Sequence, residues 1–225
     1  MNTGLLFISI VLVFGSLLLV YKLIGKSGII GYMGVATIIA NIMICKSVDL
    51  LGMSATLGNV MFASNFLATD ILTENYGVKE AKKGVIFALF AAVGFLVTTQ
   101  IALQFRANAY DFAQDSMETL FTLTPRITLA SVSLFAVSNY VDVKLYDYMR
   151  RKSNGRHMWL RNNICTVLSN CTENFLFYII AFAFVMQWSE IIAASIAATI
   201  IETIIALCDT PFLYLSKHIT GGDTH

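Results

Sequence analysis

The chain has 225 residues, of which 57% are hydrophobic and only 13% are charged. Soluble domains usually carry about 25% charged residues, so this composition excludes a soluble globular protein. It predicts a polytopic membrane protein with no separate soluble domain. The formal net charge of +1 gives no reason to expect nucleic-acid binding.

Seven apolar segments follow one another along the chain, and each is near the length of about 20 residues that crosses a bilayer as a helix. They span residues 4–22, 28–46, 54–74, 83–105, 124–149, 162–186 and 190–216. None alternates in the manner of a strand, and open strands cannot satisfy their backbone groups in lipid. The sequence therefore predicts an all-α membrane bundle of seven transmembrane helices.

The basic residues are distributed unevenly between the two sides of this predicted bundle. Eleven of the fifteen fall on one side: Lys22, Lys26, Lys79, Lys82, Lys83, Arg150, Arg151, Lys152, Arg156, Arg161 and Lys217. Cytoplasmic loops carry the excess of Lys and Arg. We therefore expect a multi-pass protein of the cell membrane with its N-terminus outside and its C-terminus in the cytoplasm.

The longest outer connection, residues 106–123, mixes polar and aromatic side chains in RANAYDFAQDSMETLF. It predicts either a short amphipathic helix at the outer surface or a solvated loop. The basic loop around residues 150–161 is expected to meet anionic lipid headgroups.

Polar side chains interrupt several of the apolar segments, most densely in GNVMFASNFLATDILTENYG, residues 58–77. Asp70 and Glu74 are four residues apart, so a helix brings them to one face. Glu173 is flanked by Asn170 and Asn174 in the middle of the sixth segment. Ionisable groups within a membrane are costly and commonly functional. A structural role remains the alternative for each of them.

Because several segments each contribute one polar cluster, we expect a shared hydrated cavity that binds a solute. The candidate substrate-binding residues are Glu173, Asn170, Asp70, Asn41, Asn65, Arg126, Asp142 and Glu74. The alternatives are a snorkelling or ion-paired role for Arg126 and a cap or gate role for Asp70 and Glu74.

Several motifs resemble the queuosine precursor transporter family (YhhQ type, also called vitamin uptake transporters). They are NFLATDILTENYGVKEAKK, Arg126 with the following ITLAS, WLRNNICTVLSNCTENFLFYIIAF and the closing DTPFLYL. The resemblance covers about residues 35–216. It implies a single transporter domain, residues 1–225, with an accessory helix (4–22) and a six-helix core (28–216). That core would be similar to the substrate-binding components of energy-coupling factor transporters.

The resemblance also implies import of a 7-deazaguanine (queuine, preQ1 or preQ0), the small molecule that feeds queuosine synthesis for tRNA modification. Such a ring offers N1–H and a 2-amino group to one carboxylate; Glu173 is our first candidate and Asp70 the second. Asn41, Asn65 and Asn170 could bond the O6 and N3 edges. A cationic side-chain amine would suit a second carboxylate, such as Asp142 or Glu74. A homodimer is expected.

Two other functions were weighed against this transporter. One is the substrate-binding subunit of an energy-coupling factor type vitamin transporter, with Ala36 and Ala40 in its docking surface. The other is an intramembrane enzyme, which the sequence disfavours because its three histidines (His157, His218 and His225) lie in loops or the tail. The sequence suggests no cofactor, no metal site and no enzymatic activity.

Overall fold

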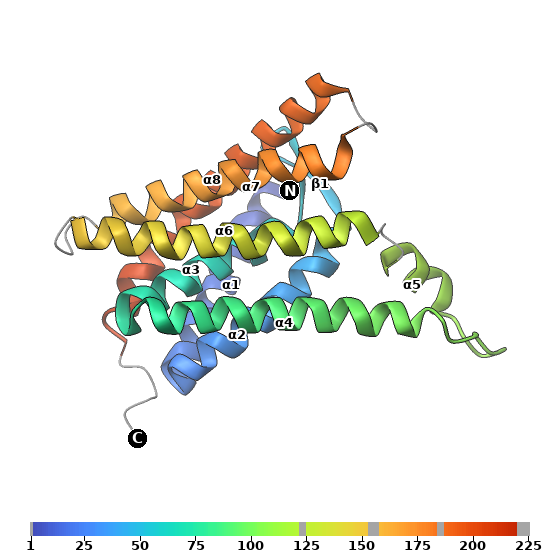
Figure 1. The fold of residues 1–225 in the computed structure, drawn as a ribbon, viewed down its shortest axis with the longest axis horizontal. Helices are drawn as coiled ribbons and strands as arrows, with labels where there is room; N and C mark the ends of the chain where they lie inside the picture. The colour runs from blue at the N-terminus through green and yellow to red at the C-terminus, as the bar shows by residue number, and fades with distance from the viewer. Residues whose placement is uncertain (1, 122–124, 153–157, 184–186, 220–225) are drawn as a thin grey trace.

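The computed structural model describes residues 2–121, 125–152, 158–183 and 187–219, and within them the chain forms helices and one β-hairpin (Figure 1). The elements are α1 (Asn2–Ile24), α2 (Lys26–Met43), β1 (Ser47–Leu50), β2 (Met53–Thr56), α3 (Gly58–Tyr76), α4 (Val78–Ala102), α5 (Gln114–Phe121), α6 (Pro125–Lys152), α7 (Met158–Phe182) and α8 (Trp188–Ser216). Seven of these helices, all except α5, run for 18 to 29 residues.

The seven predicted segments each coincide largely with one long helix, but the predicted start of the third was wrong, because residues 54–56 belong to a β-hairpin that spans residues 47–56. These residues form an antiparallel hairpin in which Leu50 pairs with Met53. The helix predicted to begin at residue 54 therefore begins at Gly58. The connection predicted to lie outside, residues 106–123, contains a short helix, α5, which was one of the two alternatives.

The hairpin turns at Leu51 and Gly52, whose φ angles are 54° and 80°. Two positive φ angles in a two-residue loop define a type I′ turn, which usually carries Asn-Gly or Asp-Gly. Leucine rarely adopts a positive φ, so the sequence gives no ordinary hairpin signal here.

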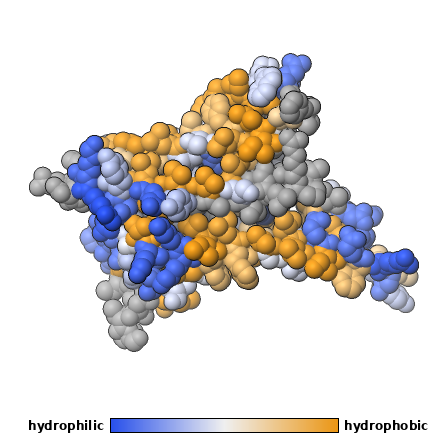
Figure 2. All heavy atoms as spheres, viewed as in Figure 1, coloured by the Kyte–Doolittle hydropathy of each residue, from blue (hydrophilic) through white to orange (hydrophobic). Residues whose placement is uncertain are grey.

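Four of the described helices, α1, α2, α4 and α8, combine the length and the apolar composition needed to cross a membrane. The other long helices, α3, α6 and α7, have the length but carry more polar residues. On the face shown in Figure 2, hydrophobic side chains occupy much of the middle and hydrophilic ones gather toward the ends. This is the organisation of a multi-pass membrane protein; seven crossings remain a prediction.

Helix α3 lies at the centre of the bundle, in contact with α1, α2, α4, α6 and α8. Nearly all its residues from Gly58 to Thr73 are buried, polar ones included. Gly58 is needed because a Cβ there would lie 2.9 Å from the Ala40 carbonyl oxygen of α2. A polar helix surrounded by other helices is kept away from lipid, which explains how this sequence is accommodated.

The two ends of the described chain lie at opposite ends of the bundle. Asn2 Nδ2 donates to the Asp49 carbonyl oxygen of β1, at 3.2 Å, in the hairpin that precedes α3. Lys217, after α8, pairs with Glu74 near the end of α3. An odd number of crossings requires this arrangement, and which end faces the cytoplasm remains a prediction.

Candidate functional site

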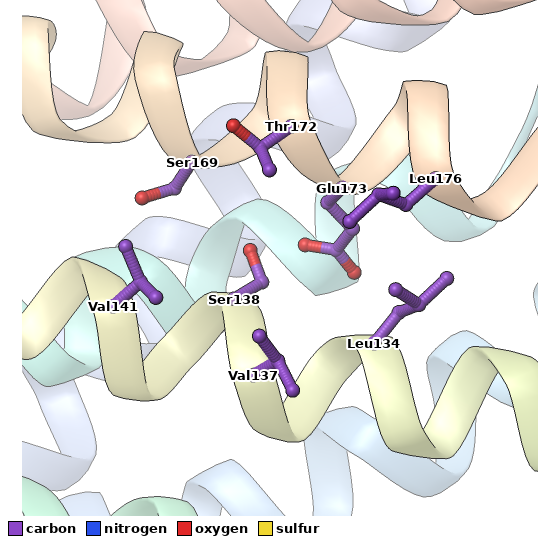
Figure 3. A pocket seen from close by; sticks show the side chains of 8 residues that line it. All are labelled: Leu134, Val137, Ser138, Val141, Ser169, Thr172, Glu173 and Leu176. Carbon is purple, nitrogen blue, oxygen red and sulfur yellow. The ribbon is translucent and has the colours of Figure 1, made fainter.

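A pocket opens between α6 and α7 (Figure 3). Its lining combines apolar side chains with three hydroxyls and one carboxylate: Leu134, Val137, Ser138, Val141, Ser169, Thr172, Glu173 and Leu176. Val137, Val141 and Leu176 are exposed on the outer side of the two helices. The pocket therefore opens toward the surface of the bundle, and Glu173 supplies its charge.

Glu173 points from α7 toward α6, where it meets Ser138 (Figure 3). The Ser138 hydroxyl is buried and projects toward this carboxylate, with no hydrogen-bond partner of good geometry. A buried polar atom without a partner is costly. The acceptor nearest to this hydroxyl is Glu173 itself, so the two side chains form a polar pair across the pocket.

Asp142 lies one helical turn beyond Ser138 on α6 and is completely buried. Its Oδ1 accepts a hydrogen bond from Ser169 Oγ of α7, at 3.3 Å, and Ser169 also lines the pocket. Thr69 of α3 faces the same carboxylate, but its hydroxyl proton is donated to the Phe66 carbonyl oxygen, at 2.7 Å. Asp142 Oδ2 is consequently left without a hydrogen-bond partner.

Glu202 of α8 extends this group of acids. Asn174 Nδ2 of α7 donates to Glu202 Oε2, at 2.6 Å. Glu173 lies near enough to both Asp142 and Glu202 for their charges to interact. We refer to Asp142, Glu173 and Glu202 as the carboxylate cluster. None of the ion pairs of the described residues involves any of its three members.

Asn170, predicted as a site residue, lies on α7 one turn from Asn174 and is almost completely buried. Its Oδ1 has no hydrogen-bond partner. It therefore offers an acceptor next to the carboxylate cluster, although it does not line the pocket itself.

Asn41 and Asn65 lie apart from the pocket, between α2 and α3. Asn41 Nδ2 donates to the Thr37 carbonyl oxygen of its own helix, at 2.8 Å. Asn65 Nδ2 donates to Thr37 Oγ1 across the helices, at 3.1 Å, while its Oδ1 is buried without a partner. Thr37 thus accepts from both side chains, within α2 from Asn41 and across the α2–α3 interface from Asn65.

Asp70 is 1% exposed in the middle of α3, which contacts both α6 and α8. It is thus in the interior of the bundle and does not line the α6–α7 pocket. Arg126 belongs to the first turn of α6, but its side chain lies outside the described part of the structure.

The surroundings of Glu74 resemble those of a helix cap, the alternative to ligand binding that was given for this residue. Lys217 Nζ lies 2.7 Å from Glu74 Oε1, and Arg150 Nε lies 3.5 Å from Glu74 Oε2. Tyr146 Oη donates to Oε2 at 3.4 Å, and Arg150 also donates to the Thr73 carbonyl oxygen at 2.8 Å. This group, the Glu74 clamp, ties the ends of α3, α6 and α8 together.

The pocket has a volume of about 30 Å³, which holds a water molecule or two. Pockets for drug-sized ligands commonly measure about 300–1,000 Å³. A bicyclic base therefore needs α6 and α7 to separate, or their apolar side chains to change rotamer, before it can lie against Glu173.

The sequence reasoning missed Ser138 and Ser169 as site residues. Ser138 precedes Asp142 by four residues, and Ser169 precedes Glu173 by four. A spacing of four places both hydroxyls on the same helix face as an acid. This pattern was present in the sequence and could have been used to find them.

Three comparisons with known proteins bear on this site. A family model described as "Putative vitamin uptake transporter" matches residues 56–216. A protein of Bacillus subtilis (strain 168) named "Probable queuosine precursor transporter" is 35% identical over 207 residues, covering 92% of this chain and 90% of the relative. A protein of the same name from Haemophilus influenzae (strain ATCC 51907 / DSM 11121 / KW20 / Rd) is 24% identical over 128 residues, covering 57% of this chain and 52% of the relative. No solved structure matches.

The chain is thus a multi-pass membrane protein of the transporter class. It belongs to the vitamin uptake transporter family, which confirms the resemblance found in the sequence. The matched range begins within the hairpin and includes all the helices that carry the carboxylate cluster.

Proposed function

We propose that the protein imports a queuosine precursor, a 7-deazaguanine base, and binds it between α6 and α7. The observation that carries this proposal is Glu173, a carboxylate that lines a pocket between two helices of a membrane bundle and has no cationic partner among the described residues. The relatives' names supply the substrate class.

The chemistry of the base suits this carboxylate. N1–H and the 2-amino group are neighbouring donors, and one carboxylate accepts both in a bidentate pair. The Ser138 hydroxyl, which faces Glu173, can bond the same edge of the base. Asn170 supplies a further acceptor nearby. In the apolar surroundings of Leu134, Val137 and Leu176, such hydrogen bonds are stronger than in water.

The membrane arrangement that goes with this proposal has seven crossings, the N-terminus outside and the C-terminus in the cytoplasm. Clustering of Lys22, Lys79, Lys82, Arg150 and Lys217 on one side of the predicted bundle supports that orientation. We further propose that the whole chain is one transporter domain that works as a homodimer.

A separate energising subunit has less support. The docking surface predicted for it contained Ala36 and Ala40, and both are completely buried within the bundle. They pack inside the protein, where small residues let helices approach closely, and they offer nothing to a partner.

Uptake of a labelled base tests the proposal. Cells that cannot make queuosine precursors, expressing the chain, should accumulate labelled preQ1 or queuine above an empty-vector control. Glu173→Gln should lower the initial rate at least about tenfold, because Gln presents a donor where the base needs an acceptor. Glu118→Gln, the same substitution at an exposed site on α5, should transport normally. Accumulation no higher than the vector control, with the protein present in the membrane, would refute the proposal.

A further inference from the structure

The charges around the pocket are unbalanced. The carboxylate cluster places three acids from α6, α7 and α8 within electrostatic range of one another, and the ion pairs of the described residues reach none of them. The three acids do not form a metal site in the described residues. In a membrane bundle, acids are tolerated where they are paired or hydrated. Neighbouring acids that have no cationic partner among the described residues can hold a positively charged ligand.

Within the cluster, Asp142 has the free capacity to receive such a charge. Asn174 occupies one oxygen of Glu202, and Glu173 faces Ser138 across the pocket. Asp142 has one oxygen held by Ser169, a residue of the pocket wall, and one buried oxygen with no hydrogen-bond partner. The serine bond orients the carboxylate, and Oδ2 stays without a hydrogen-bond partner behind the pocket wall, since Asp142 itself does not line the pocket.

The positions of Glu173 and Asp142 relative to α6 would also allow a single ligand to contact both residues. Glu173 meets Ser138, and Asp142 follows Ser138 by four residues, which is a rise of about 6 Å along the helix. A 7-deazaguanine carries its N1–H and 2-amino donors on one edge and its C7 substituent on the other. A base that lies along α6 with its donor edge on Glu173 would bring its C7 substituent toward Asp142.

We propose that Asp142 binds the protonated amine of the C7 substituent, so that the protein selects an amine-bearing 7-deazaguanine over its uncharged nitrile. This inference rests on the proposed function. An aliphatic amine such as that of preQ1 is charged at neutral pH, as a lysine is, and forms a charge-assisted bond to a carboxylate. The nitrile of preQ0 carries no proton to donate, so it would leave Asp142 unsatisfied.

Competition between the two bases tests this selectivity. Uptake of labelled preQ1 is measured in the presence of unlabelled preQ1 or preQ0, for the full-length wild type and for Asp142→Asn. Asparagine keeps the shape of the side chain and an oxygen for Ser169 but removes the charge. Asp147→Asn is the matched control, since Asp147 lies on the same helix and pairs with Arg151 at 2.9 Å outside the pocket.

In the wild type and in Asp147→Asn, preQ1 should compete at least about tenfold better than preQ0, the scale of a hydrogen bond to a charged group. In Asp142→Asn this preference should fall to within about threefold, mainly through weaker preQ1 binding. Equal competition by the two bases in the wild type, or an unchanged preference in Asp142→Asn, would overturn the inference while leaving the proposed function standing. Competition by neither base would refute the proposed function itself. If Asp142→Asn fails to reach the membrane, the wild-type comparison alone decides.

Discussion

Two sets of acids in the same bundle have opposite surroundings. Glu74 lies beside Lys217, Arg150 and Tyr146 at one end of the molecule, and these three neighbours are positive or donate a hydrogen bond. Asp142, Glu173 and Glu202 lie farther along the helices, and their partners are neutral hydroxyls and an amide. The first set is electrostatically complete without a ligand, whereas the second is not.

This difference separates structural acids from binding acids. Removing a charge that is already compensated exposes its partners and destabilises the fold. Removing a charge that repels its neighbours relieves the fold but removes the ligand's anchor. The two sets should therefore respond in opposite directions to the same Glu→Gln substitution.

The largest change in stability should come from ligand binding at the carboxylate cluster. A precursor base at about 100 times its Kd adds about 2.7 kcal/mol to the free energy of unfolding. The purified wild type should therefore melt at a clearly higher temperature with preQ1 than without it. Glu173→Gln should show no such increase at the same concentration, while its melting temperature without ligand equals or exceeds that of the wild type.

The comparison would fail if Glu173→Gln melted well below the wild type without ligand, because Glu173 would then have a structural partner. Glu118→Gln on α5 controls for the amide substitution itself, since Glu118 is exposed and contacts only Gln114 in its own helix.

A smaller effect, of opposite sign, is expected at the Glu74 clamp. Glu74→Gln leaves Lys217 and Arg150 without their counter-ion, but both cations are more than a third exposed. We therefore expect the free energy of unfolding to fall by about 1–2 kcal/mol. Breaking a fully buried pair would cost more, about 3–5 kcal/mol. Thermal unfolding of the purified protein measures it, and the affinity for preQ1 should stay within about twofold. If Glu74→Gln were as stable as the wild type, Glu74 would have no structural role.

The smallest effect should occur at the surface pair of Asp147 and Arg151, which belongs to neither set. Exposed pairs four residues apart on a helix contribute about 0.3–0.5 kcal/mol. Asp147→Asn should therefore change neither the melting temperature nor transport measurably. A loss of transport in this variant would show that charge on α6 matters in general, and the effect of Asp142→Asn could then not be assigned to the pocket.

Hydrophobic length allowed the sequence to predict the long helices, because a run of about 20 apolar residues has few alternatives. Hydrophobic length did not predict the hairpin, where the turn uses Leu51 and Gly52 in place of the usual Asn-Gly.

The burial of α3 could not be predicted from the sequence either. The polar residues of α3 distinguish it from the other helices in the sequence. Only the structure shows that packing against five other helices keeps these residues away from lipid.

For the site, the sequence singled out several acids but could not distinguish their surroundings. Lys217 and Arg150, which pair with Glu74, are distant from it in the sequence. The hydrogen bond of Asn65 to Thr37, which joins α3 to α2, likewise depends on residues that are distant in the sequence. The decisive information is which charge has a partner, and partnership across helices is a property of the tertiary structure.

The most direct test is the binding affinity of the purified protein for preQ1, measured by calorimetry for the wild type, Glu173→Gln and Glu74→Gln. The account predicts that Glu173→Gln weakens binding by about 1.5–3 kcal/mol, whereas folded Glu74→Gln binds as the wild type does. Equal affinities in the wild type and Glu173→Gln would contradict it, since the one carboxylate that lines the pocket would then have no part in holding the base.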